Sequence, residues 1–170
     1  MNKFVRHLAV GGALAALVLT GCSQPPTAAA VVEGTPISDR SVRETIGALA
    51  VGSGVDPAQI PPGDVARSLI VGAASEVIAA EQGVSVEDGA IDAAIAADPQ
   101  LARVAVVPGT DQYVRGAATF RIVLDKIGEA AYRSALAELD VEMNPRYGSW
   151  IAGESGIRID SSGLAVDPKA

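Results

Sequence analysis

Apolar residues recur at helical spacing in several separate stretches of this chain. The longest predicts a helix over Asp64–Gln82, because one apolar stripe repeats every four residues and a second flanks it. The first stripe is Val65, Leu69, Ala73 and Val77, and the second is Ala66, Ile70, Ala74 and Ile78. Asp64 suits an N-cap, and Gly83 is placed to end the helix in the left-handed conformation.

A second long helix is predicted from Thr110 or Asp111 to about Ile127. Its apolar stripe is Tyr113, Ala117, Phe120, Leu124 and Ile127. Gly128 breaks it, and Ala130–Leu139 continues as helix. Two shorter helices are predicted, one from Ser38 or Asp39 to about Ala50, the other from a Ser85 cap to Asp98-Pro99.

The remaining segments are extended or irregular. Ala30–Ile37 predicts a short strand and turn, and the Gly- and Pro-rich stretch Val51–Gly63 predicts a loop. Gln100–Val107 fits either a strand or a helix. Val141–Met143 alternates like a strand, and Gly156–Val166 fits a weak hairpin turning at Ser161-Ser162-Gly163. The predicted fold class is mainly α, with a short N-terminal strand and a C-terminal extended segment or small hairpin.

The start of the chain has the features of an export signal. Lys3 and Arg6 precede the apolar stretch Leu8–Leu19, which is shorter than the roughly 20 residues of a spanning helix. The next residues, Leu19-Thr20-Gly21-Cys22, resemble the lipobox of bacterial lipoproteins. The resemblance implies that residues 1–21 are removed and that Cys22 receives diacylglycerol and palmitate-type chains. The alternative is an ordinary secretory signal with a chance cysteine.

Residues 22–30, with Pro25 and Pro26, predict a lipidated cysteine followed by a flexible tether. The mature protein would then lie on the extracytoplasmic face of the cell membrane, with the lipid bilayer as its first partner. Acyl chains give durable attachment because each buried methylene contributes about 0.8 kcal/mol.

Charge and residue usage exclude several classes of function. The chain has 13 Lys and Arg against 20 Asp and Glu, which argues against nucleic acid and against attachment through anionic lipid headgroups. Its one cysteine is Cys22 and its one histidine, His7, lies in the export signal. The mature chain therefore offers no usual metal site and no Ser-His or Cys-His nucleophile, and we expect no cofactor and no enzyme activity.

Three other features have structural interpretations. The acids Glu87, Asp88 and Asp92 suit a helix N-terminus, where they compensate the dipole. Gly52-Ser53-Gly54 lacks the Lys of a phosphate-binding loop and is interpreted as a flexible linker. Tyr147 and Trp150 are either a binding platform or, more often for a lone Trp in an aromatic-poor chain, packing anchors.

Two segments carry a resemblance to a known family. Ala29–Ser38, with Val-Val-Glu-Gly-Thr-Pro-Ile-Ser, and Leu69–Ile95 look like the N-terminal domain of the periplasmic chaperone SurA. The ending Val141–Trp150 looks like the close of SurA-N-like lipoproteins of Gram-positive, high-GC bacteria. Its motif residues are Asn144, Pro145, Arg146, Tyr147, Gly148 and Trp150. The resemblance implies a helical domain over residues 31–150 and a tail over residues 151–170.

The resemblance implies a chaperone-like module that binds unfolded or extended exported polypeptides without ATP. Relatives carry parvulin domains whose sites use histidine, and this chain has no such domain, so no isomerase activity is expected. The predicted peptide-binding wall is the apolar stripe of the two long helices: Leu69, Ile70, Val77, Tyr113, Phe120 and Leu124. The alternative is an adaptor that binds one folded envelope protein.

Overall fold

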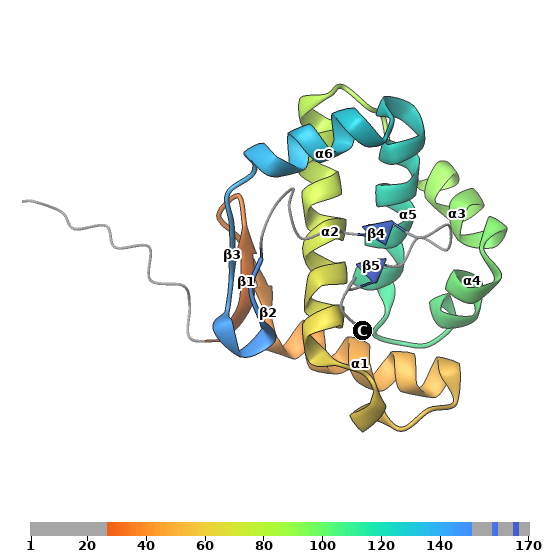
Figure 1. The fold of residues 1–170 in the computed structure, drawn as a ribbon. Helices are drawn as coiled ribbons and strands as arrows, with labels where there is room; N and C mark the ends of the chain where they lie inside the picture. Colours follow the sequence, from red (N-terminus) through yellow and green to blue (C-terminus); the bar gives the residue numbers. More distant parts are fainter. Residues whose placement is uncertain (1–26, 151–157, 160–164, 167–170) are drawn as a thin grey trace, which may run out of the picture.

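The computed structural model describes residues 27–150, 158–159 and 165–166. The predicted signal peptide, the lipobox residues Leu19, Thr20 and Gly21, and Cys22 lie outside the described residues. The described part is 69% helix, with six helices and a small antiparallel sheet, so the predicted mainly α class is confirmed (Figure 1). Among these residues, no helix is both long and apolar enough to cross a bilayer.

The elements follow one another in an order close to the prediction. They are β1 (Ala28–Val32), β2 (Thr35–Ser38), α1 (Asp39–Ser53), the 3-10 turn η1 (Pro57–Gln59), α2 (Pro62–Glu81), α3 (Asp88–Ala97), α4 (Pro99–Ala105), α5 (Asp111–Ile127), α6 (Glu129–Glu138), β3 (Val141–Met143), the 3-10 turn η2 (Pro145–Tyr147), β4 (Arg158–Ile159) and β5 (Ala165–Val166).

The sheet has the strand order β2-β1-β3, with both pairings antiparallel. A two-residue turn joins β1 to β2, and both Glu33 and Gly34 adopt positive φ (46° and 75°), as tight hairpins require. Strand β1 begins at Ala28, so the last residues of the predicted tether belong to the domain. Ala28, Ala29 and Ala30 are buried because β1 is the central strand and packs on α2.

Helix α1 begins as predicted and ends later than predicted. The Ser38 hydroxyl accepts a hydrogen bond from the Ser41 N–H at 3.0 Å, which is the expected N-cap. The helix continues to Ser53, and Gly54 closes it in the left-handed conformation at φ 69°. The interpretation of Gly52-Ser53-Gly54 as a flexible linker is therefore wrong, as is the loop predicted to begin at Val51.

The two long helices are confirmed, with small changes at their ends. Helix α2 begins at Pro62 and not at an Asp64 cap, because proline is favoured in the first turn, where its missing N–H costs nothing. Gly83 has φ 64°, the predicted left-handed conformation. Figure 1 shows α2 and α5 side by side in the centre, with the sheet on one side and α3 and α4 on the other.

The segment between the long helices is more helical than predicted. Helix α3 starts after Glu87, and Ser85 does not cap it. The ambiguous segment Gln100–Val107 is largely helix α4. The Asp98 carboxylate caps α4 by accepting from the N–H groups of Gln100 and Leu101 at 2.9 and 3.1 Å. This cap, with Pro99 at the first helical position, selects helix over strand.

A pair of glycines sets the distance between α2 and α5. A Cβ atom on Gly72 would lie only 2.7 Å from the Gly116 Cα, so the two backbones touch directly. One helical turn further along, the Ser75 and Tyr132 hydroxyls form a buried hydrogen bond of 2.8 Å. Tyr132 also packs edge-on against Phe120, with ring centroids 5.2 Å apart. We name this contact between α2, α5 and α6 the glycine seam.

The C-terminal motif closes the domain against its N-terminal end. The Asn144 side-chain amide donates to the Ala28 carbonyl at 3.1 Å, and the Tyr147 hydroxyl donates to the Asp39 carboxylate at 3.1 Å. Arg146 forms an ion pair with the same carboxylate. Trp150 is partly buried and packs against the core. These contacts favour packing over a binding platform for Tyr147 and Trp150.

The motif is completed by its glycine and proline. Pro145 begins the 3-10 turn η2, and Gly148 follows it at φ 116°, a conformation that favours glycine. The predicted C-terminal hairpin is confirmed by the pairing of β4 with β5, in which Arg158 lies opposite Val166. Its predicted turn, Ser161-Ser162-Gly163, lies outside the described residues. Strand β5 contacts α2.

Candidate functional site

The predicted peptide-binding wall lies mostly inside the protein. Leu69, Ile70, Tyr113 and Phe120 are between 0% and 7% exposed, and Val77 and Leu124 are half-buried. The expectation that this stripe stays available to clients is therefore corrected. Helix α2 contacts the sheet, α1, α5 and α6, so its apolar positions are covered on most sides. Of the six residues, Tyr113 lines a pocket between four helices.

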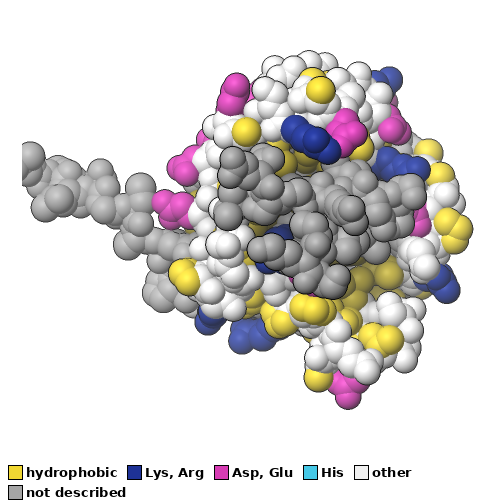
Figure 2. Space-filling model, viewed as in Figure 1, with side chains coloured by type: hydrophobic (Ala, Val, Ile, Leu, Met, Phe, Trp, Pro, Cys, Tyr) yellow, Lys and Arg dark blue, Asp and Glu magenta, His cyan; other side chains and the backbone are white. Residues whose placement is uncertain are grey.

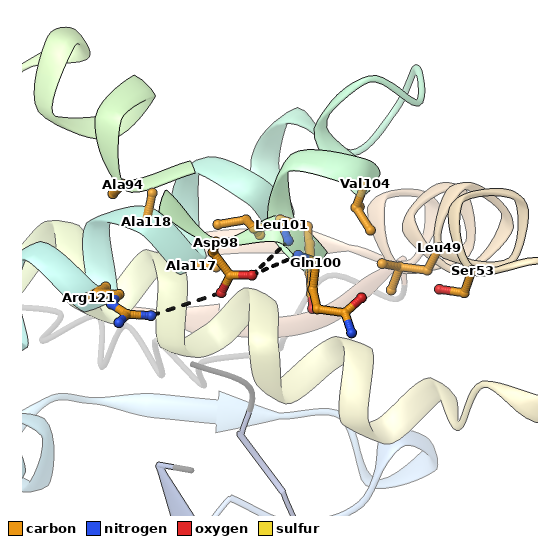
Figure 3. A pocket seen from close by; sticks show the side chains of 11 residues that line it. Leu49, Ser53, Ala94, Asp98, Gln100, Leu101, Val104, Ala117, Ala118 and Arg121 are labelled. Carbon is orange, nitrogen blue, oxygen red and sulfur yellow. Dashed lines mark hydrogen bonds and ion pairs between the residues drawn. The ribbon is translucent and has the colours of Figure 1, made fainter. Parts of the chain in front are cut away.

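That pocket lies where α1, α3, α4 and α5 meet, and it has a volume of about 280 Å³. Its lining is mainly aliphatic and aromatic, with a few polar side chains (Figure 3). The lining residues are Leu49, Ser53, Ala94, Asp98, Gln100, Leu101, Val104, Tyr113, Ala117, Ala118 and Arg121. Val104, Tyr113 and Ala118 are buried and form the floor, whereas Ser53, Gln100 and Arg121 are exposed and form the rim.

Small residues and one helix break create the pocket. Gly52 brings α1 against α4, because its Cβ position lies 3.5 Å from the Val104 and Val107 side chains. Asp98-Pro99 ends α3 and redirects the chain into α4. On α5, Ala117 and Ala118 present only methyl groups to the space that remains. The result is a concave surface between four helices, which is a common location for binding sites.

The polar rim is organised by Asp98. One carboxylate oxygen accepts from two N–H groups at the start of α4, and the other lies 3.9 Å from the Arg121 guanidinium. Figure 3 shows the Arg121 side chain extending toward Asp98 across the pocket. The Arg121 side chain is 48% exposed, and within the described part of the chain Asp98 is its one charged partner. Its guanidinium donors therefore remain accessible to a ligand at the rim.

Tyr113 keeps its proton at neutral pH. Burial raises the pKa of the Tyr113 phenol, and the nearby Asp98 charge raises it further, to about 12. The hydroxyl is thus a hydrogen-bond donor in an apolar wall, and it adds no charge to the floor. A neutral apolar floor with polar groups confined to the rim suits an apolar side chain whose adjoining backbone remains near water.

Sequence reasoning missed most of this site. The pocket residues Leu49, Leu101 and Val104 sit at helical positions that the sequence assigned to a short helix or to an ambiguous segment. Asp98 was interpreted only as part of a helix stop, and Arg121 attracted no interpretation. One available signal was the apolar content of Gln100–Val107, which in a helix leaves one face in need of a partner.

Among the described residues, the most exposed large apolar side chains lie at this same end of the molecule. Val51 and Val55, at the end of α1 and just beyond it, are 73% and 41% exposed, and Val106, just after α4, is 81% exposed. Figure 2 shows hydrophobic side chains gathered around the end of α1 and the hollow beside it. In the described part of the chain, no group of three or more His, Cys, Asp and Glu side chains could hold a metal ion.

Comparison of the chain with protein-family models, curated proteins and solved structures gives no match. The resemblance to the SurA N-terminal domain therefore stays a prediction.

Proposed function

We propose that this protein is a membrane-anchored lipoprotein that binds apolar side chains of unfolded or extended exported polypeptides, without ATP and without isomerase activity. The observation that carries the proposal is the open pocket between α1, α3, α4 and α5, with its apolar floor and polar rim. The resemblance of two segments to a chaperone domain points in the same direction. Attachment through Cys22 is part of the proposal.

The size of the pocket favours side chains over a whole small molecule or a folded domain. Its volume of about 280 Å³ is just below the range typical of drug-sized ligand sites. One or two large apolar side chains would fill it. Each would remove its apolar surface from water, at about 25 cal/mol per Å². An aliphatic or aromatic residue would enter the floor made by Val104, Tyr113 and Ala118.

The rim fits the backbone that carries such a side chain. Arg121 and the Gln100 amide can donate to peptide carbonyls, whereas the Asp98 carboxylate can accept from a peptide N–H. None of these groups distinguishes one apolar side chain from another. Binding is therefore expected to be weak and tolerant of sequence, as suits a protein that must release many different clients.

The test is suppression of aggregation. A chemically unfolded exported protein is diluted into buffer without ATP, with the chain from residue 22 onward present at several-fold excess. The chain should lower the light scattering that aggregation of the unfolded protein causes. Ala117→Phe places a phenyl ring in the pocket and should abolish most of the protection. Ala131→Phe adds the same group to an exposed position of α6 and should leave protection intact, which controls for added hydrophobicity.

Equal protection by the Ala117→Phe and Ala131→Phe variants would exclude the pocket as the client site. No protection by the unaltered protein would contradict the chaperone-like function itself. A single stoichiometric partner recovered from envelope extracts, in place of many substoichiometric clients, would favour the adaptor. In that case the exposed Val51, Val55 and Val106 are the first surface to test.

A further inference from the structure

The two ends of α1 have different surroundings. The first described residue, Thr27, lies at the N-terminal end of α1, where its carbonyl accepts a hydrogen bond from the Asp39 N–H at 2.8 Å. The pocket residues Leu49 and Ser53 lie near the other end. Because α1 has 15 residues, its ends are separated by roughly 22 Å. The point where the tether joins the domain is thus far from the pocket.

Guanidinium groups gather at the end where the tether joins. Arg40 and Arg43 lie in the first turns of α1, and Arg146 lies on η2 beside Asp39. The side chains of Arg40 and Arg146 are 80% and 49% exposed, and Arg43 is also exposed. Figure 2 shows Lys or Arg side chains, in dark blue, at the lower left, where Figure 1 shows the start of α1.

These three guanidinium groups outnumber the carboxylates that they pair with, although acids outnumber bases in the chain as a whole. Asp39 pairs with Arg146, and Glu44 accepts from Arg40 at 2.7 Å, so two carboxylates pair with two of these three guanidinium groups. We name Arg40, Arg43 and Arg146 the basic edge. Over the chain as a whole acids predominate, with 20 Asp and Glu against 13 Lys and Arg.

We propose that the basic edge faces an anionic bilayer and orients the anchored domain, so that the pocket opens away from the membrane. The inference rests on the proposed attachment through Cys22. Five peptide units separate Cys22 from Thr27 and span at most about 18 Å. So short a tether holds the start of α1 within reach of the headgroups. Anionic headgroups attract guanidinium groups and repel the acidic remainder of the surface.

The acyl chains supply the attachment, and the basic edge supplies only the orientation. A net acidic domain without its lipid is therefore not expected to bind the bilayer. Once it is held there, rotation that brings the acidic surfaces toward the membrane is disfavoured, and the basic edge stays closest. The pocket then lies roughly a helix length above the headgroups, open to polypeptides in the surrounding envelope space.

Trp150, the one tryptophan of the chain, provides a probe at the right place. It follows η2 by three residues and so lies near the basic edge. A maleimide phospholipid coupled to Cys22 of the purified chain from residue 22 onward fixes the anchor without relying on acylation in cells. On phosphatidylglycerol vesicles with a spin-labelled headgroup lipid, Trp150 fluorescence should be quenched at least twofold more than a tryptophan at the far end. Trp150→Phe with Val106→Trp supplies that second probe.

Charge reversal sharpens the test. Arg40→Glu with Arg43→Glu should reduce the quenching of Trp150, whereas Arg103→Glu, on the exposed surface of α4, should not. Equal quenching at both probe positions, or equal effects of the two charge reversals, would overturn the proposed orientation. Absence of acyl chains on Cys22 of the protein from cells, seen by mass spectrometry, would instead overturn the attachment. The two failures are therefore distinguishable.

Discussion

Helix α5 packs closely against its neighbour on one face and leaves an open pocket on another. Toward α2, Gly116 meets Gly72 so closely that a single methyl group would collide with backbone. Toward α1 and α4, the small residues Ala117 and Ala118 leave a pocket of about 280 Å³. Both faces use residues with little or no side chain. The difference is that α2 contacts α5 backbone to backbone, whereas α1 and α4 contact each other and leave a space beside α5.

Small residues on one helix therefore predict either close contact with the neighbouring helix or an unfilled space beside it. What decides is whether the opposite helix can approach. In the glycine seam, the approach is stabilised by the buried Ser75–Tyr132 hydrogen bond and by the Phe120–Tyr132 contact. At the pocket, Gly52 lets α1 approach α4, and the space between these helices and α5 stays open. The seam therefore stabilises the fold, whereas the pocket stays open.

The largest effect is expected from one methyl group in the seam. Gly72→Ala should lower the free energy of unfolding by about 2–3 kcal/mol, because its Cβ would lie 2.7 Å from the Gly116 Cα and the backbones must separate. Urea unfolding followed by circular dichroism measures the loss. The control is Gly47→Ala on α1, where no atom lies within 4 Å. There the change should raise the free energy of unfolding by about 0.5–1 kcal/mol, through helix propensity. The same sign for both would contradict the seam.

A slightly smaller loss is expected when the buried hydroxyl pair is broken. Ser75→Ala leaves the Tyr132 hydroxyl buried without its partner and should cost about 1–3 kcal/mol in urea unfolding. Combining it with Tyr132→Phe removes both hydroxyls and should recover part of the loss. If the double variant is no more stable than Ser75→Ala alone, the pair is not a coupled element of the seam.

Alkaline pH should destabilise the fold through one tyrosine in the glycine seam and one in the pocket. Burial raises the pKa of Tyr132 to about 12, although its hydrogen bond with Ser75 acts in the opposite direction. Burial likewise raises the pKa of Tyr113, in the pocket, to about 12. Between pH 10 and 12 the unfolded chain loses these protons and the folded chain keeps them. Each tyrosine should then lower the free energy of unfolding by about 1.4 kcal/mol per pH unit. Urea unfolding at several pH values between 10 and 12 tests this slope, and Tyr132→Phe should remove one of the two contributions to it.

A large side chain in the pocket should cost less than the methyl group in the seam. Ala117→Phe is expected to change the free energy of unfolding by less than about 1 kcal/mol, because the phenyl ring enters open space instead of occupied backbone. Thermal and urea unfolding measure it. A loss as large as that of Gly72→Ala would mean that the space is not available to a ligand's side chain.

The smallest effect is a change in one titration. Asp98→Asn keeps an oxygen that can cap α4 and removes the charge that raises the pKa of Tyr113. The pKa of Tyr113, followed by ultraviolet absorbance, should fall but stay above its ordinary value of 10, since burial is the larger cause. An unchanged titration would show that Asp98 and Tyr113 do not share the pocket.

Sequence patterns predicted the helices well where the apolar periodicity ended at a helix-breaking glycine. The apolar stripes located α2 and α5 to within two residues, and Gly83 and Gly128 marked true ends. The prediction was wrong where glycine stood inside a helix. Gly52 and Gly54 suggested a linker, yet one is a contact site within α1 and the other is its C-cap.

The pocket could not be predicted from the sequence, because periodicity identifies the apolar face of a helix but not the element that packs against it. Leu69 and Phe120 had the same appearance in sequence as a binding wall, and their burial depends on how closely α2 and α5 approach. Leu101 and Val104 became recognisable only once Asp98 fixed α4 as a helix. Helix pairing is a tertiary property, so the choice between core and site required the arrangement of all four helices around the pocket.

The central position of β1 has a mechanical consequence. The described chain begins at this strand, which is hydrogen-bonded to β2 on one edge and to β3 on the other. A pull on the N-terminal segment, as from a fixed end opposed by a load elsewhere in the domain, would act along β1. Two ladders would then resist in shear together. Strands loaded in this direction share the force among several bonds, so the domain is built to resist traction at the end where we propose that it is attached.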